Sequence, residues 1–287
     1  MAIVEARGLR KIYRDAVALD GIDLRVEEGR VLGIVGPNGA GKSTALHAIL
    51  GLLPFEGTLR VLGRDPWVER DALMRDVCFI ADVAILPRWI RVDQALDYVA
   101  GVHPRFDRAK AQAFLDRSGV RHTSKVRELS KGLAAQVHLA IVMAIDARLL
   151  VLDEPTLGLD LLASRTFYDS LIHDYFDRTR TVIVTTHQID ELQDVLTDVV
   201  FLDRGRIVLE SAMDAYESRF FEVLVTPDRI GEARALGPIH ERQALGRTVL
   251  TFDRADRERL EALGEVRTPS IAELFVAVVA ASQESGR

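Results

Sequence analysis

The sequence predicts a layered α/β fold with a parallel sheet, followed by a smaller α/β module. Three apolar runs, at residues 31–35 (VLGIV), 149–152 (LLVL) and 181–185 (TVIVT), alternate with helical stretches. Such runs are typical of strands that are buried on both faces of a parallel sheet. The 287 residues suffice for about two domains. We expect them at residues 1–217 and 218–287, because the strand and helix pattern restarts there on a smaller scale.

The composition is that of a folded globular protein. Hydrophobic residues make up 48% and charged residues 28%, as in folded globular proteins. No apolar stretch is long enough for a membrane-spanning helix, and the N-terminus lacks the features of a signal peptide. The single cysteine, Cys78, permits no internal disulfide. This cysteine usage favours a cytoplasmic protein. The net charge of −6 indicates a protein that does not bind nucleic acid.

The remaining elements can be placed in chain order. We expect short strands at residues 2–6 and 17–26, a helix at 44–52 after the strand at 31–35, and a hairpin at 199–209 that turns at 203–205. In the smaller module, we expect strands at 220–225, 247–252 and 265–267, and helices at 227–236 and 256–263. The last helix begins with a capping box of Ser270 and Glu273. Its predicted apolar face consists of Ile271, Leu274, Phe275, Val278 and Val279.

A phosphate-binding loop follows the first buried strand. Residues 36–43 (GPNGAGKS) match the pattern G-x-x-x-x-G-K-[ST], and they lie between a strand and a helix as that motif requires. Glycines let backbone N–H groups converge on phosphate oxygens, and a lysine adds positive charge. The alternative is a glycine turn that binds nothing. The predicted ligand is a nucleoside triphosphate, held by Gly36, Pro37, Asn38, Gly39, Ala40, Gly41, Lys42, Ser43 and Thr44.

Three further polar residues follow buried strands. Asp153 and Glu154 come after the run at 149–152, and His187 follows the run at 181–185. Ligands bind at the carboxyl ends of strands in such sheets. We expect Asp153 and Ser43 to hold Mg²⁺, Glu154 to accept a proton from the attacking water, and His187 to contact the γ-phosphate. The alternative for the two acids is a solvated strand end.

The order of these motifs resembles that of the ATP-binding cassette (ABC) family. Residues 129–133 (LSKGL) resemble its signature motif, and residues 157–160 (LGLD) resemble its D-loop. The resemblance covers residues 2–217. Two further features, KVRELSKG at 125–132 and SIAELF at 270–275, are similar to those of cassettes from bacterial ABC-2 type exporters.

The resemblance implies a P-loop NTPase fold: a RecA-like α/β core, an antiparallel β subdomain and a helical signature subdomain, with a small C-terminal α/β domain. It implies an ATPase in which Tyr13 stacks on adenine, while Ser130 and Gly132 reach the γ-phosphate that a second copy binds. Two copies would then close head to tail around two Mg-ATP. They would power a separately encoded transmembrane permease from the inner face of the cell membrane, in the direction of export.

Some residues depart from the family pattern. Asp82 stands where the family usually has glutamine, and we expect it to be a third ligand of Mg²⁺. Residues 82–103 are predicted to face the permease, and the alternative is that their apolar side chains belong to the core. Two other functions remain open: a non-transport ABC ATPase that acts in the cytoplasm, and a regulatory cassette with reduced hydrolysis.

Overall fold

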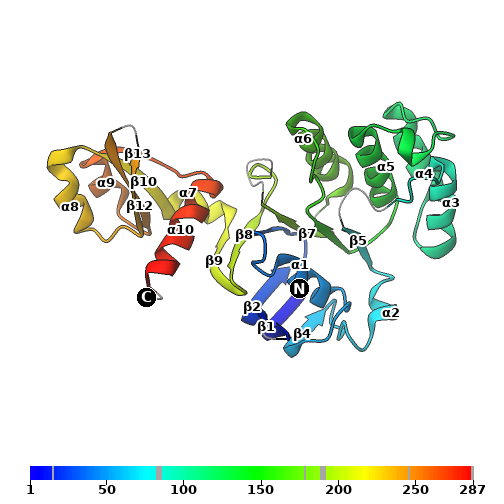
Figure 1. Ribbon diagram of the computed structural model, residues 1–287, viewed down its shortest axis with the longest axis horizontal. Helices are drawn as coiled ribbons and strands as arrows, with labels where there is room; N and C mark the ends of the chain where they lie inside the picture. The colour runs from blue at the N-terminus through cyan, green and yellow to red at the C-terminus, as the bar shows by residue number, and fades with distance from the viewer. Residues whose placement is uncertain (15, 82–85, 178, 188–191, 245, 286–287) are drawn as a thin grey trace.

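The computed structural model describes residues 1–14, 16–81, 86–177, 179–187, 192–244 and 246–285 (Figure 1). In that part of the chain, the central sheet has six strands in the order β5-β6-β7-β3-β8-β9. Their bounds are Val77–Ala81 for β5, Leu149–Asp153 for β6, Thr181–Thr186 for β7, Val31–Val35 for β3, Asp198–Asp203 for β8 and Arg206–Ala212 for β9. All neighbours pair in parallel except β8 and β9, which form the predicted hairpin.

The predicted α/β fold class is confirmed, and the three apolar runs form the centre of this sheet. Every residue of β3 and β7 is buried, as are the first four residues of β6. In the pairing register, Asp153 lies opposite Thr185, and Val35 lies opposite Thr186. The carboxyl ends of these strands therefore meet at one edge of the sheet.

A smaller antiparallel sheet covers one face of the central sheet. Its strand order is β2-β1-β4, with β1 at Ala2–Tyr13, β2 at Ala16–Glu27 and β4 at Glu56–Val61. Helix α1 (Lys42–Ile49) contributes to the same buried core, together with side chains such as Val151, Ile183 and Val200 of the central sheet. The helix begins two residues earlier than predicted, because Gly41 adopts a left-handed conformation at its N-terminus.

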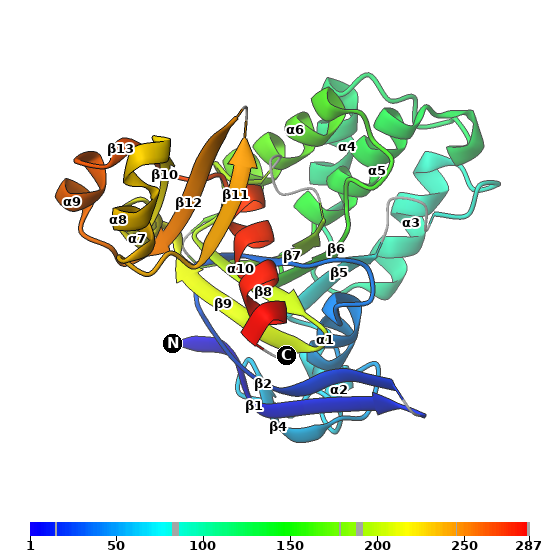
Figure 2. The same cartoon turned by 60° about the vertical axis from the view of Figure 1, so that its left-hand side comes forward.

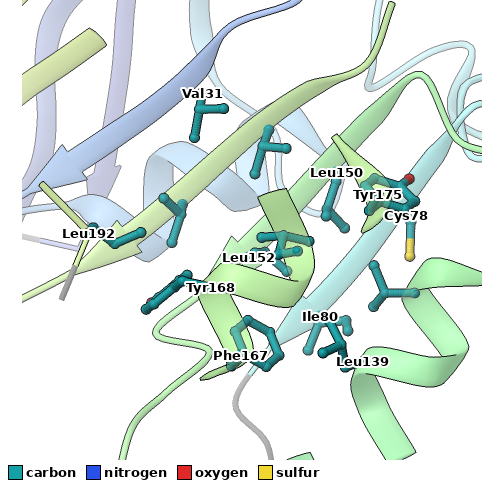
Figure 3. Packing of buried hydrophobic residues seen from close by; sticks show 14 of the residues in the cluster. Val31, Cys78, Ile80, Leu139, Leu150, Leu152, Phe167, Tyr168, Tyr175 and Leu192 are labelled. Carbon is teal, nitrogen blue, oxygen red and sulfur yellow. The ribbon is translucent and has the colours of Figure 1, made fainter. Parts of the chain in front are cut away.

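Helices cover the other face of the central sheet (Figure 1). They are α3 (Val92–Val102), α4 (Arg108–Arg117), α5 (Lys131–Met143) and α6 (Leu161–Ser170), while the short α2 (Arg70–Leu73) lies before β5. Ser130 caps α5, since its Oγ accepts a hydrogen bond from Leu133 N over 3.2 Å. Figure 3 shows Leu139 of α5 and Phe167 of α6 among the buried side chains of β5 and β6.

A separate antiparallel sheet follows in the C-terminal part, in the order β11-β12-β10-β13. Its strands are β10 (Phe220–Val225), β11 (His240–Ala244), β12 (Arg247–Asp253) and β13 (Gly264–Arg267). Short helices α8 (Ile230–Arg234) and α9 (Arg257–Glu261) contribute to a core of their own on one face. The helix predicted at 227–236 is present, but its first turn, Pro227–Arg229, is 3₁₀ and the α-helical part ends at Arg234. β11 was not predicted, because HERQA lacks alternating apolar residues.

The last helix, α10 (Ile271–Ser285), leaves this sheet and lies along β8 and β9 (Figure 2). Helix α7 (Met213–Arg219) joins β9 to β10. Ser270 and Glu273 form the predicted capping box, with hydrogen bonds of 2.9 and 3.2 Å. The helix buries Ile271, Leu274, Ala277 and Val278 and only partly buries Phe275 and Val279. Phe275 meets Phe201 of β8 edge to face, with 5.2 Å between ring centroids. None of the described helices is long and apolar enough to span a membrane.

Candidate functional site

The loop from Gly36 to Ser43 joins β3 to α1, and two of its glycines have no room for a side chain. A Cβ atom on Gly36 would lie 2.3 Å from Leu202 O, and one on Gly41 would lie 2.4 Å from Ala18 O. Gly41 also has a φ of +108°, and Gly39 has a φ of +83°. These positions require glycine, so the backbone can curl in front of α1. Pro37, Asn38 and Gly39 remain exposed, which leaves the loop open to a ligand.

Lys42 begins α1 and lies under this loop. Its side chain is only 6% exposed, and Nζ donates a hydrogen bond to Gly36 O over 2.7 Å. The same Nζ lies 3.2 Å from Glu154 Oε1, which places the ammonium group between the loop and the end of β6. Positive charge at a helix N-terminus favours a phosphate group. Ser43 follows Lys42 and is exposed.

Asp153 ends β6 and Glu154 follows it, and Thr185 of the neighbouring strand forms hydrogen bonds with both residues. Thr185 Oγ1 donates to Asp153 Oδ1 over 2.5 Å and accepts the backbone N–H of Glu154 over 3.2 Å. Glu154 has a φ of +49°, an uncommon conformation for a residue other than glycine. The chain therefore turns sharply after Asp153, and the two carboxylates take different directions. Sequence reasoning missed Thr185, because its role depends on the register between two strands.

His187 follows β7 and contacts the glutamate. His187 Nδ1 lies 2.8 Å from Glu154 Oε2, and the backbone N–H of His187 donates to the same oxygen over 3.3 Å. Glu154 thus bridges Lys42 and His187. The structure brings together these three residues, Asp153 and the phosphate loop, all at the carboxyl edge of the central sheet.

Among the described residues, no hydrogen bond or ion pair joins the other predicted site residues to this group. Tyr13 ends β1 and is 46% exposed, with Lys11 Nζ 5.1 Å from its ring centroid. Ser130 and Gly132 lie at the start of α5, and within the described residues no hydrogen bond joins them to the phosphate loop. Asp82, the predicted third metal ligand, lies outside the described residues.

The donor atoms at this edge suit Mg²⁺. A carboxylate from Asp153 and a hydroxyl group from Ser43 are hard oxygen ligands, and Mg²⁺ usually takes one or two protein ligands beside phosphate oxygens and water. Within the described part of the chain, no group of three or more His, Cys, Asp or Glu side chains could hold a metal ion by itself. A metal that arrives with a nucleotide would find the oxygen ligands of Asp153 and Ser43 at this edge.

Comparison with known proteins identifies relatives of the whole chain. A family model described as "ABC transporter" matches residues 19–157. The chain is 32% identical over 290 residues to a daunorubicin resistance ATP-binding protein of Streptomyces coeruleorubidus, covering 97% of this chain and 87% of the relative. It is 31% identical to the Nod factor export ATP-binding protein I of Cupriavidus pinatubonensis, covering 91% of this chain and 84% of the relative.

Solved structures show the same fold. The cbiO1 subunit of an ABC transporter complex of Clostridium perfringens is similar with a TM-score of 0.64 and 26% identity, covering 74% of this chain and 89% of that chain. A dimeric ATP-binding cassette in a post-hydrolysis state, bound to ADP and Pi, has a TM-score of 0.62 and 22% identity. It covers 73% of this chain and 98% of its own, and at this identity it supports the fold alone.

Proposed function

Because this chain belongs to the ABC transporter family and is an ATP-hydrolysing subunit of that family, we propose roles for its individual residues in ATP binding and hydrolysis. The observation that carries the proposal is the convergence on Glu154. Lys42 Nζ lies 3.2 Å from one carboxylate oxygen and His187 Nδ1 lies 2.8 Å from the other, directly below the phosphate loop. A base, a phosphate-binding cation and a histidine are thus within reach of one reacting group.

The loop residues hold the phosphate groups of ATP. Pro37 has no N–H, so the backbone N–H groups that follow it in the loop bind phosphate oxygens at the start of α1. Lys42 neutralises charge on the β- and γ-phosphates. Tyr13 stacks on the adenine ring. Support for this role comes from the exposure of its side chain at the end of β1.

Glu154 and His187 act on the reacting atoms. Glu154 accepts a proton from the attacking water, and His187 orients the glutamate and contacts the γ-phosphate. Asp153 and Ser43, with Asp82 as a further candidate, hold Mg²⁺, which supplies positive charge to the transferring phosphoryl group. Thr185 fixes the direction of the Asp153 carboxylate.

Two copies of the chain close head to tail around two Mg-ATP, and Ser130 and Gly132 of each copy complete the site of the other. The dimer drives a separate transmembrane permease from the cytoplasmic side of the membrane. Relatives named for drug resistance and for Nod factor export support the export direction. The division of the chain into a cassette at 1–217 and an accessory domain at 218–287 is part of the same proposal.

Sedimentation of a hydrolysis-deficient variant tests these roles. Glu154→Gln should bind ATP and remain dimeric without releasing phosphate, because the amide cannot accept the proton. The wild-type chain in ADP should be monomeric. A Glu154→Gln protein that stays monomeric in ATP would contradict the catalytic role of Glu154. Lys42→Ala should abolish ATP binding. The control Lys110→Ala, on the exposed surface of α4, should leave ATP binding intact. An unchanged affinity of Lys42→Ala for ATP would refute the assignment of the phosphate loop.

A further inference from the structure

Two segments that pair at the start of α3 carry an excess of positive charge. Residues 88–93 run alongside residues 121–127: Val126 N donates to Ile90 O over 3.0 Å, and Val92 N donates to Ser124 O over 3.0 Å. We name these two segments the basic ribbon. It contains one acid, Asp93, although the whole chain has a net charge of −6. Its cations are Arg88, Arg91, Arg121, Lys125 and Arg127.

Within the described part of the chain, none of these five cations forms an ion pair, and the four arginines are exposed. Cations nearby in the helical layer are neutralised, since Arg108 pairs with Asp97 over 2.6 Å. The acid that follows the ribbon, Glu128, accepts the backbone N–H of Lys125 over 3.0 Å. The basic ribbon therefore presents positive charge to an anion outside the chain.

Exposed apolar side chains lie beside this charge. Trp89, within the ribbon, is 70% exposed. Tyr98 follows Arg91 by seven residues and Val102 follows Tyr98 by four, and this spacing places all three on one side of α3. Tyr98 is 67% exposed and Val102 is 62% exposed. Figure 1 shows α3 at the outer edge of the helices that cover the central sheet.

We propose that the basic ribbon and this side of α3 bind the anionic surface of a lipid bilayer. Groups of about four to eight cations attract anionic lipid headgroups, and the rings of Trp and Tyr are amphipathic and lie at headgroup level. The five cations and the two exposed rings provide both features. The chain would thus contact the lipid beside its permease as well as the permease itself.

An acidic protein segment is the competing occupant. A hollow of about 530 Å³ lies next to the ribbon, and its lining includes Arg88 and Arg127 but not Trp89, Tyr98 or Val102. A protein segment that filled this hollow would leave the exposed rings unused. A bilayer surface engages the cations and the rings together, so the lipid accounts for more of what is exposed.

Tryptophan fluorescence provides the test, because the chain contains only Trp67 and Trp89. Trp67→Phe leaves Trp89 as the single reporter, and Trp89→Phe leaves Trp67, which is 50% exposed, as the matched control. Each purified protein is titrated with vesicles of phosphatidylcholine, with or without phosphatidylglycerol. We expect the emission of Trp67→Phe to shift to shorter wavelength only when phosphatidylglycerol is present. The emission of Trp89→Phe should not change.

Charge variants show whether the ribbon supplies the attraction. Replacing three of its arginines by glutamine should lower the partition coefficient on phosphatidylglycerol vesicles roughly a hundredfold, at about a factor of five for each cation. Added salt should weaken binding of the wild type as well. The variant combines Arg88→Gln, Arg91→Gln and Arg127→Gln. The matched control removes three exposed arginines elsewhere, through Arg204→Gln, Arg254→Gln and Arg259→Gln, and should bind as the wild type does.

Three results would overturn the proposal: an unchanged Trp89 emission with phosphatidylglycerol vesicles at low salt, equal binding by the two charge variants, or an equal emission shift with poly-glutamate in place of vesicles. The last result would assign the surface to an acidic protein segment. Circular dichroism and the melting temperature report whether the charge variants fold, and the titration of Trp67→Phe decides the proposal if they do not. The inference does not rest on the roles of Lys42 and Glu154, because vesicle binding is measured without nucleotide.

Discussion

Replacing Thr185 by valine removes one hydroxyl group from the acidic end of β6 and leaves the shape of the side chain almost unchanged. This hydroxyl group donates to Asp153 Oδ1 over 2.5 Å and accepts the N–H of Glu154 over 3.2 Å. That N–H also donates to Thr185 O over 3.1 Å, so it keeps a partner in the variant. The loss therefore falls mainly on the Asp153 carboxylate, a proposed ligand of Mg²⁺.

The size of the effect follows from the burial of this hydrogen bond. Thr185 is fully buried, and a hydrogen bond to a charged group contributes about 1.5–3 kcal/mol. At 1.4 kcal/mol for each factor of ten, the Mg²⁺ concentration for half-maximal ATP hydrolysis should rise about 10- to 100-fold. The affinity for ADP without metal should not change, because Lys42 and the loop backbone remain intact.

Phosphate release measured across a Mg²⁺ titration at saturating ATP provides the assay. Thr185→Ser should restore the wild-type requirement, since it retains the hydroxyl group. Thr248→Val removes another buried threonine hydroxyl, which accepts from Gln243 Nε2 over 3.0 Å in the C-terminal sheet, and serves as the matched control. An unchanged Mg²⁺ requirement in Thr185→Val, with a normal melting temperature, would refute the reasoning.

Three further predictions concern stability and reactivity. Gly36→Ala should lower the free energy of unfolding by about 3 kcal/mol, because its Cβ would lie 2.3 Å from a backbone carbonyl oxygen. Gly39→Ala should lower it by only about 1–2 kcal/mol, because the new Cβ has open space and the cost comes from the φ of +83°. The opposite ranking of the two variants in chemical denaturation would contradict this account. Burial raises the pKa of the Cys78 thiol to about 12, so maleimide should label it only after unfolding, and rapid labelling of the native protein would disagree. Burial opposes ionisation of Glu273, but the hydrogen bond from Arg267, with others from Ser270, outweighs this effect. These bonds lower the pKa of Glu273 from its ordinary 4.5 to about 2. The stabilisation from Glu273 should therefore be complete above about pH 4.5 and decline as the pH falls toward 2, and Glu273→Gln should flatten that part of a melting-temperature profile.

Local patterns were sufficient to predict most of the cassette. The apolar runs gave the three central strands, and β10 extends over Phe220–Val225 as its alternation predicts. Ser130 and Ser270 begin helices because hydroxyl caps are a short-range signal. The phosphate loop, the acidic pair and His187 could be placed at one sheet edge, since the carboxyl ends of parallel strands meet there.

Other features depend on contacts between distant residues. Thr185 faces Asp153 only because β6 and β7 pair in one particular register, which neither strand specifies alone. β11 has a polar sequence, and it becomes a strand through its pairing with β12 and the ion pairs of Arg242. The contact between Gln193 and Ile271 joins residues 78 positions apart, and no periodic pattern indicates it.

The position of α10 bears on how the protein is made. Phe201 and its neighbours on β8 leave the ribosome well before Phe275, the side chain that packs against Phe201. At about 5–20 residues per second, the 74 residues from 202 to 275 take about 4–15 s to synthesise. During that interval, the apolar face of the β8–β9 hairpin stays uncovered, because α10 has not yet been translated. A chaperone that binds nascent chains would find its target there, and premature termination before residue 271 would leave that face permanently uncovered.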